Sequence, residues 1–202
     1  MKVMLINAVP YGSTGKIMFS ISKLVKERGG NVVAATGFSW HKAKLENYEI
    51  IGNIFTKTLH MGLSRIFGNH GCYSTFSTNA LIRKIKKFSP DIIHLHNVHG
   101  WYLNLSLLFK YLKECNIPVV WTLHDCWAFT GGCAHYAYCN CNRWLTGCGE
   151  CCNLSSPPQR LLTASRSRRR LKLTAVIRSR PAAAASSVTS GSVSSPSTSR
   201  TI

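Results

Sequence analysis

The sequence predicts an α/β fold in which helices flank a parallel sheet. Four apolar runs have the length and composition of buried strands: residues 2–9, 31–37, 91–97 and 118–125. Segments with helical spacing separate these runs, and a glycine turn joins the first run to the first helix. Strand, crossover helix and strand in this order make a parallel βαβ unit. Repetition of this unit predicts a Rossmann-like sheet over residues 1–125.

The first helix is expected at residues 16–30. Its apolar side chains at helical spacing define the face that we expect to be buried: Ile17, Ile21, Leu24 and Val25. Gly29 or Gly30 should end this helix, because glycine readily adopts the left-handed conformation common at helix ends.

A short strand and three helices are expected in the middle of the chain. Residues 48–52 have the composition of a strand, and residues 54–67 have the spacing of a helix that Gly68 ends. Residues 78–88 form an amphipathic pattern whose basic outer face suits either solvent or acidic lipid. The last of these helices is expected near residues 104–115.

Histidines and polar residues gather where two of the apolar runs end: His94, His96, Asn97, His99, His124 and Asp125. In parallel sheets, ligands bind beyond the carboxyl ends of the strands. Asn97, His99 and His124 are therefore the best placed for a ligand, with Asp125 next to His124. His94 and His96 share one face of a strand, and a core position explains His94 equally well.

The turn Gly12-Ser13-Thr14-Gly15 is expected to open the first helix. Glycines there permit close backbone approach, and the unpaired N–H groups of a first helical turn suit a phosphate. The spacing differs from that of a nucleoside-triphosphate P-loop, in which Ser or Thr follows the lysine, because Ile17 follows Lys16 here. The three-glycine dinucleotide fingerprint is not matched either. On spacing alone, a tight turn without a ligand is an equally good explanation.

Positive charge dominates the composition, with 25 Lys and Arg against 7 Asp and Glu and a net charge of +18. Such a charge favours anionic partners: nucleic acid, acidic lipid or phosphorylated substrates. Nine of the basic residues and none of the acidic ones follow residue 152, so about half of the charge belongs to the tail. No apolar run reaches the ~18 residues of a membrane span. The start lacks a secretory signal pattern, so we expect a cytoplasmic chain.

Seven of the nine cysteines fall within residues 126–152. In the cytoplasm, free thiols or metal ligands are expected rather than disulfides. One pair has C-x-x-C spacing, and two earlier cysteines complete a candidate structural zinc site: Cys133, Cys141, Cys148 and Cys151. Free thiols remain an open alternative. A redox C-x-x-C normally opens a helix after a strand, which this pair does not.

Residues 153–202 contain no Phe, Trp, Tyr, Asp or Glu and are rich in Ser, Ala, Arg and Pro. Such a segment cannot bury enough apolar surface to offset the entropy lost on ordering. Its arginine run has no interleaved aromatic residues on which bases would stack. We therefore expect a disordered basic tail, and nucleic acid is not the expected partner.

Three segments resemble the amino-terminal half of bacterial family 4 glycosyltransferases: MLINAVPYGSTGKI, PDIIHLHNVHGWYLN and PVVWTLHDCWAFTGGC. Members of this family are retaining enzymes of the GT-B fold that build surface polysaccharides. The resemblance covers roughly residues 1–152, with the motifs in the family's order. A cysteine- and tryptophan-containing segment that ends in C-x-x-C also occurs in one branch of the family, so residues 126–152 resemble an extension of the same domain.

The resemblance implies a cleft between two Rossmann-like domains, with the acceptor mainly on the amino-terminal one. Gly12–Gly15 would face the diphosphate of a nucleotide-sugar donor, and His124 matches a family histidine that contacts the donor sugar. Asn97 and His99, with Asp125 beside them, would line the acceptor side. The implied partners are a nucleotide sugar and a glycan or lipid-linked acceptor, with peripheral contact at the inner face of the membrane. The family generally needs no divalent ion for catalysis.

Residues 153–202 do not resemble the family's second domain, with its basic phosphate-binding residues and paired glutamates, so we expect that domain to be missing. We expect a reading-frame shift near Cys151 or Cys152, so that the tail is out-of-frame translation. Residues 1–152 would then be the acceptor half of a sugar transferase, inactive alone. Two alternatives stay open: a small zinc-stabilised basic protein that binds nucleic acid, and one chain of a split transferase.

Overall fold

Five parallel strands form one sheet in the part of the chain that the computed structural model describes, which is residues 1–38, 48–67, 71–130, 134 and 142. The strands are β1 (Lys2–Asn7), β2 (Asn31–Thr36), β3 (Tyr48–Ile50), β4 (Ile92–Leu95) and β5 (Val119–Trp121). Their order in the sheet is β3-β2-β1-β4-β5, and every neighbouring pair is parallel. The predicted Rossmann-like parallel sheet is confirmed.

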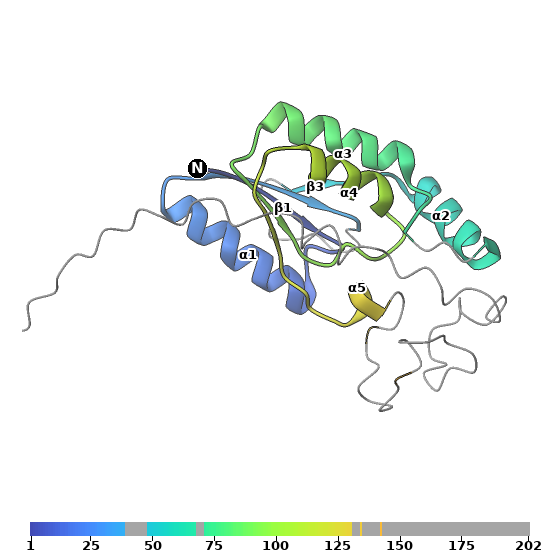
Figure 1. Ribbon diagram of the computed structural model, residues 1–202. Helices are drawn as coiled ribbons and strands as arrows, with labels where there is room; N and C mark the ends of the chain where they lie inside the picture. Colours follow the sequence, from blue (N-terminus) through green and yellow to red (C-terminus); the bar gives the residue numbers. More distant parts are fainter. Residues whose placement is uncertain (39–47, 68–70, 131–133, 135–141, 143–202) are drawn as a thin grey trace, which may run out of the picture.

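Helices cover both faces of this sheet. They are α1 (Gly12–Glu27), α2 (Ile54–Phe67), α3 (Thr75–Phe88), α4 (Leu105–Glu114) and the short α5 (Trp127–Thr130). Figure 1 shows α1 on one side of the sheet and α2, α3 and α4 on the other. Successive residues of a strand point to opposite faces, so each strand contributes to both layers.

The core is correspondingly divided in two. On the α3 and α4 side, strand residues such as Met4, Ile93 and Leu95 pack with Ile85 and Leu108. On the α1 side, a smaller cluster holds these buried residues: Val3, Leu5, Met18, Val25, Val32 and Ala34. The buried face predicted for the helix at residues 78–88 is confirmed, because Leu81, Ile82 and Ile85 are all buried in α3.

Strand order reverses between β1 and β4, which makes this the topological switch point of the sheet. The chain steps from β1 outward to β2 and β3, and then returns to the other side of β1 with β4 and β5. Ligands of open parallel sheets bind at the carboxyl ends of the strands at such a point. Asn7 ends β1 there, and residues 96 and 97 follow β4.

The start and the buried face of α1 differ from prediction. Gly12–Gly15 is the first turn of α1 rather than a turn before it, and the buried stripe is Gly15, Met18, Ser22 and Val25. Ile17 and Leu24, expected inside, are 44% and 53% exposed. Apolar residues occur on all sides of this helix, so its spacing is compatible with two different buried faces. A Cβ on Gly15 would lie 2.5 Å from the carbonyl carbon of Pro10, and this close approach turns the Gly15 side inward.

The end of α1 agrees with prediction. Gly29 has φ +72°, which is the left-handed conformation that glycine adopts without strain. The Gly29 N–H donates to the carbonyl of Lys26 at 2.9 Å, and the Gly30 N–H donates to that of Val25 at 2.9 Å. These two bonds form a Schellman motif that ends the helix.

The last predicted strand is shorter than residues 118–125. Only Val119–Trp121 pair with β4, although the Thr122 N–H still donates to the Leu95 carbonyl at 2.9 Å. His124 therefore lies on the segment that leaves the sheet toward α5 rather than on a strand.

Helix α2 has the predicted bounds, but its buried face is polar and large apolar side chains are exposed on its outer face. Its buried residues are polar, namely Lys57, His60 and Ser64. Ile54 and Phe55, in contrast, are 74% and 72% exposed. Within this stripe, His60 is held by hydrogen bonds: its Nδ1 lies 2.6 Å from Ser74 Oγ, and its Nε2 accepts from the Gly71 N–H at 3.2 Å. The predicted stop at Gly68 lies outside the described residues.

Candidate functional site

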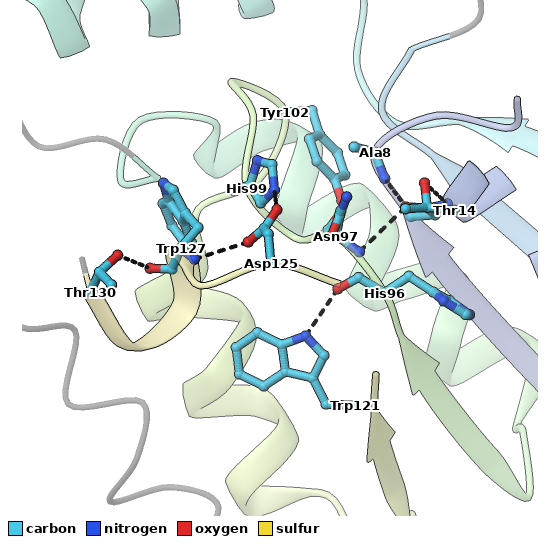
Figure 2. Close-up of polar contacts among 11 residues, drawn as sticks. Ala8, Thr14, His96, Asn97, His99, Tyr102, Trp121, Asp125, Trp127 and Thr130 are labelled. Carbon is cyan, nitrogen blue, oxygen red and sulfur yellow. Dashed lines mark hydrogen bonds and ion pairs between the residues drawn. The ribbon is translucent and has the colours of Figure 1, made fainter. Parts of the chain in front are cut away.

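Asn7 joins the ends of β1, α1 and β4 at the switch point. Its side chain is fully buried, and its Oδ1 accepts hydrogen bonds from the N–H groups of Ala8 (2.8 Å) and Asn97 (3.3 Å). Its Nδ2 donates to the Val9 carbonyl at 3.0 Å and to Thr14 Oγ1 at 3.3 Å. The Asn7 amide thereby ties Thr14, in the first turn of α1, to Asn97, which follows β4; Thr14 and Asn97 are labelled in Figure 2.

An open hollow of about 190 Å³, part of it open solvent, lies beyond the carboxyl ends of β4 and β5. Ten residues line it: His96, Asn97, Val98, His99, Trp121, Leu123, His124, Asp125, Trp127 and Ala128. Of the six residues that the sequence predicts at these strand ends, five are among them, and His94 is not.

His99 and Asp125 form a directly bonded pair in this hollow. His99 Nε2 lies 2.7 Å from Asp125 Oδ2, while Asp125 Oδ1 accepts from the Trp127 N–H at 2.9 Å (Figure 2). The Asp125 side chain is only 13% exposed, and the His99 side chain 29%. The His99 ring also packs on Trp127 with the centroids 5.3 Å apart. The carboxylate therefore fixes both the orientation of His99 and the start of α5.

Three histidine rings lie together at the same strand ends. The rings of His94 and His96 lie 4.3 Å apart, and those of His96 and His124 lie 5.2 Å apart and within 15° of parallel. His96 Nδ1 is 2.9 Å from His124 Nε2, and His94 Nε2 is 2.8 Å from Thr122 Oγ1. Burial, with the neighbouring histidines, lowers the pKa of His96 to about 4. Burial and His124 lower the pKa of His94 as well.

Two aromatic side chains donate hydrogen bonds to the backbone carbonyls of residues 96 and 97. Trp121 Nε1 donates to the His96 carbonyl at 2.9 Å, and the hydroxyl of fully buried Tyr102 donates to the Asn97 carbonyl at 2.6 Å (Figure 2). Burial raises the pKa of Tyr102 far above its ordinary value, so the hydroxyl keeps its proton and stays a donor. The side chains of His96 and Asn97, which line the hollow, therefore project from a backbone that these hydrogen bonds fix.

The glycine turn lies at the same edge of the sheet but outside the lining of the hollow. Gly12 and Ser13 are exposed, and α1 has no side-chain cap and no acidic residue in its first turn. The N–H groups of a first helical turn lack intrahelical partners and carry partial positive charge. This helix end is therefore open to an anion.

Comparisons with known proteins show the family to which the chain belongs. The model of the family described as Glycosyltransferase Family 4 matches residues 18–180, which is more than half of the chain. The chain belongs to glycosyltransferase family 4. The matched residues extend beyond residue 152, and both the domain boundary placed there and the shifted reading frame remain predictions.

Two further likenesses concern parts of this glycosyltransferase domain. It is 33% identical over 109 residues to the "Putative colanic acid biosynthesis glycosyl transferase WcaC" of Escherichia coli (strain K12). That alignment covers 51% of this chain and 26% of WcaC, so the chain spans about a quarter of this curated relative. The crystal structure of glycosyltransferase VinC in complex with DTDP is 16% identical over 61% of this chain and 34% of VinC, with a TM-score of 0.37.

The four cysteines that are predicted to bind zinc belong to a different segment of this family 4 domain. Cys133, Cys141, Cys148 and Cys151 lie outside the described part of the chain. Among the described residues, no group of three or more His, Cys, Asp or Glu is arranged to hold a metal ion. The described helices also include none long and apolar enough to span a membrane.

Sequence reasoning missed two site residues of the glycosyltransferase domain. The sequence prediction includes Asn7 in a strand, and Asn7 is the first polar residue after the apolar residues 3–6. The sequence prediction groups His96 with His94 and does not assign it to the site, yet His96 is the residue that contacts His124. The strand-end rule applied to the first apolar run identifies Asn7. The pairing of His96 with His124 depends on the β4–β5 register and has no local signal.

Proposed function

We propose that this domain forms the acceptor-side wall of a site that transfers a sugar from a nucleotide sugar to a surface-polysaccharide or lipid-linked acceptor. The observation that carries the proposal is the convergence of Asn97, His99, His124 and Asp125 around one hollow at the switch point of the sheet. Side chains that both donate and accept hydrogen bonds suit the hydroxyl groups of a sugar. The WcaC name, which refers to colanic acid biosynthesis, supports a polysaccharide acceptor.

The openness of the hollow supports a site shared with a second domain. Ligand pockets commonly bury most of the ligand. The hollow here is open to solvent, so it would leave much of a bound sugar exposed. In this proposal, a donor-binding domain closes the cleft over it, and the domain described here does not catalyse transfer by itself.

The start of α1 is the proposed contact for the donor diphosphate. Its N–H groups and the positive end of the helix dipole suit a phosphate, and the exposed Lys16 adds a nearby cation. Asn7 couples this helix end to Asn97, so the diphosphate and the acceptor would meet on one rigid frame.

His124 is the proposed contact to the donor sugar in the cleft. The chemical need is to stabilise charge that develops on the departing phosphate, which oriented N–H groups and cations meet. The His99–Asp125 pair would hold the acceptor, because Asp125 orients the His99 ring toward the same hollow.

A complementation assay tests the proposed division of labour. Transfer of labelled sugar from a panel of nucleotide sugars to a lipid extract would be measured for the full chain alone and with an added donor-binding domain of the family. We expect transfer only from the mixture. Transfer by the chain alone, or no transfer from any mixture although the donor domain binds its nucleotide sugar, would contradict the proposal.

We also propose peripheral contact with the inner face of the membrane through α2 and α3. The outer side of α2 exposes Ile54, Phe55 and Leu59, which are 74%, 72% and 51% exposed. Near the start of α3, Phe76 is 85% exposed, and the outer face of that helix is basic. Apolar side chains flanked by Lys and Arg suit the interface of an acidic bilayer.

Sedimentation with vesicles tests this contact. The full chain should bind vesicles that contain acidic phospholipid more strongly than neutral ones, and the double variant Phe55→Ser, Leu59→Ser should bind several-fold less. Leu24→Ser, at an exposed apolar position on α1 across the sheet, is the matched control. Equal loss in the control would contradict a contact through α2.

A further inference from the structure

We propose that His96 is a positioning residue that holds His124 in one tautomer, with the proton on Nδ1, so that His124 presents an N–H donor to the hollow. The use of that donor rests on the proposed function, since it would meet a hydroxyl or phosphate oxygen of the donor substrate. The tautomer itself does not depend on any substrate.

The geometry joins the two rings through one hydrogen bond. His96 Nδ1 lies 2.9 Å from His124 Nε2, which is a normal distance for such a bond. One of these nitrogens must carry the proton, and the other must accept it. The hydrogen bond that one ring nitrogen makes determines which nitrogen of a histidine is protonated.

His96 has little freedom to move away from this bond. It is 1% exposed, and its N–H donates to the Ile6 carbonyl at 2.8 Å. Its carbonyl accepts from Trp121 Nε1 at 2.9 Å, and its ring stacks on that of His94 and lies nearly coplanar with that of His124. The backbone and the ring of His96 are therefore both fixed.

The far side of the His96 ring decides where the proton lies. His96 Nε2 is buried and has no hydrogen-bond partner. If Nε2 carried the proton, a buried N–H would be left unpaired, and such groups are rarer in proteins than unpaired acceptors. With the proton on Nδ1, His96 donates to His124 Nε2 and leaves only a lone pair without a partner. A doubly protonated His96 is disfavoured near neutral pH, because burial lowers its pKa to about 4.

The consequence lies at His124. Its Nε2 accepts from His96, so its own proton must sit on Nδ1, the tautomer that free histidine disfavours. His124 lines the hollow, and within the described residues no hydrogen bond involves its Nδ1. A fixed N–H donor on His124 Nδ1 would favour a ligand oxygen that accepts a hydrogen bond and would disfavour a ligand N–H group or a cation.

Nitrogen NMR of the full chain with ¹⁵N-labelled histidine tests the tautomer directly. We expect the His124 signals to show a protonated Nδ1 and an unprotonated Nε2. In the variant His96→Phe, which keeps a stacked ring but removes the donor, His124 should revert toward the Nε2–H form. His94→Phe is the matched control, because it changes the same stack without touching the His96–His124 bond.

Two outcomes would overturn the proposal: a wild-type His124 protonated on Nε2, or an unchanged His124 tautomer in His96→Phe. If His96→Phe does not fold, as judged from its backbone amide spectrum, His96→Gln replaces it. The glutamine amide can donate to His124 Nε2, so the Nδ1–H form should persist, and its loss would also overturn the proposal. None of these spectra requires sugar transfer, so failure of the proposed function gives a different result.

Discussion

At the scale of single residues, buried polar groups rather than exposed ones organise this site. Asn7 satisfies both of its donors and its acceptor inside the protein, and Tyr102 and Trp121 fix the carbonyls of Asn97 and His96. A hydrogen bond contributes modestly to stability, but a buried partner left unpaired is strongly unfavourable. Loss of one such residue should therefore affect both the stability and the geometry of the site.

Replacing Asn7 with Ala should lower the free energy of unfolding by about 2–4 kcal/mol, because four hydrogen bonds disappear and the N–H of Asn97 loses its acceptor. Urea unfolding of the full chain measures the change. Asn31→Ala is the control, since Asn31 is exposed at the opposite edge of the sheet. A loss for Asn7→Ala no larger than for the control would contradict the central role of Asn7.

The stability of the domain should also fall in acid partly through His96. The pKa of this group is about 4 when folded and about 6.5 when unfolded, so the unfolded state takes up the proton first as pH falls. The stabilising contribution is complete above pH 6.5 and disappears between pH 6.5 and 4. At pH 4.5 it should have lost about 2–3 kcal/mol.

The measurement compares urea unfolding at pH 7 and pH 4.5 in wild type and His96→Phe. The variant has no titrating group at position 96 and should lose about 2–3 kcal/mol less than wild type between these pH values. An equal loss in both proteins would show that His96 does not titrate in this way.

At the scale of elements, α1 shows where spacing alone is insufficient. The apolar residues of α1 surround the helix, and the close approach of Gly15 to Pro10 determines which stripe is buried. In α2 the bounds follow from the sequence, but its buried stripe is polar, so a search for apolar faces predicts the wrong side. The strands, in contrast, are short and apolar and were predictable.

Gly15→Ala should destabilise the domain by about 1–3 kcal/mol, because the new Cβ would lie 2.5 Å from backbone carbon of Pro10. Gly62→Ala in α2 is the matched control, since no atom outside its chain neighbours and the nearby backbone of its own helix lies within 4 Å of its Cβ position. That variant should be stabilised by about 0.5–1 kcal/mol through reduced chain entropy. Thermal unfolding separates the two, and similar behaviour would refute the close approach at Gly15.

The prediction for the cysteine-rich segment, residues 126–152, rests on the sequence alone. If Cys133, Cys141, Cys148 and Cys151 bind structural zinc, the purified full chain should contain about one zinc per molecule by elemental analysis. The double variant Cys148→Ser, Cys151→Ser should lose it, whereas Cys115→Ser should retain it, because Cys115 follows α4 and bonds within it. A metal-free wild type would favour free thiols.

At the scale of the whole molecule, the parallel pairing of the strands and the grouping of polar residues at their carboxyl ends were both accessible from the sequence. The carboxyl ends of parallel strands meet at one edge, so Asn97, His99, His124 and Asp125 could be grouped without coordinates. The contacts among them could not, because the His96–His124 and His99–Asp125 pairs depend on how the segment after β5 leaves the sheet. Asn7 matters only because β1 lies beside β4.

The central claim is that the carboxyl edge of β4 and β5 takes part in sugar transfer. The most direct measurement is the transfer rate of the chain complemented with a donor-binding domain, compared with its His124→Ala, His99→Ala and Asn31→Ala variants. We predict a loss of about 10²-fold or more in kcat for His124→Ala. His99→Ala should chiefly raise KM for the acceptor, and Asn31→Ala at the opposite edge should change neither. Unchanged transfer by His124→Ala and His99→Ala would contradict the account.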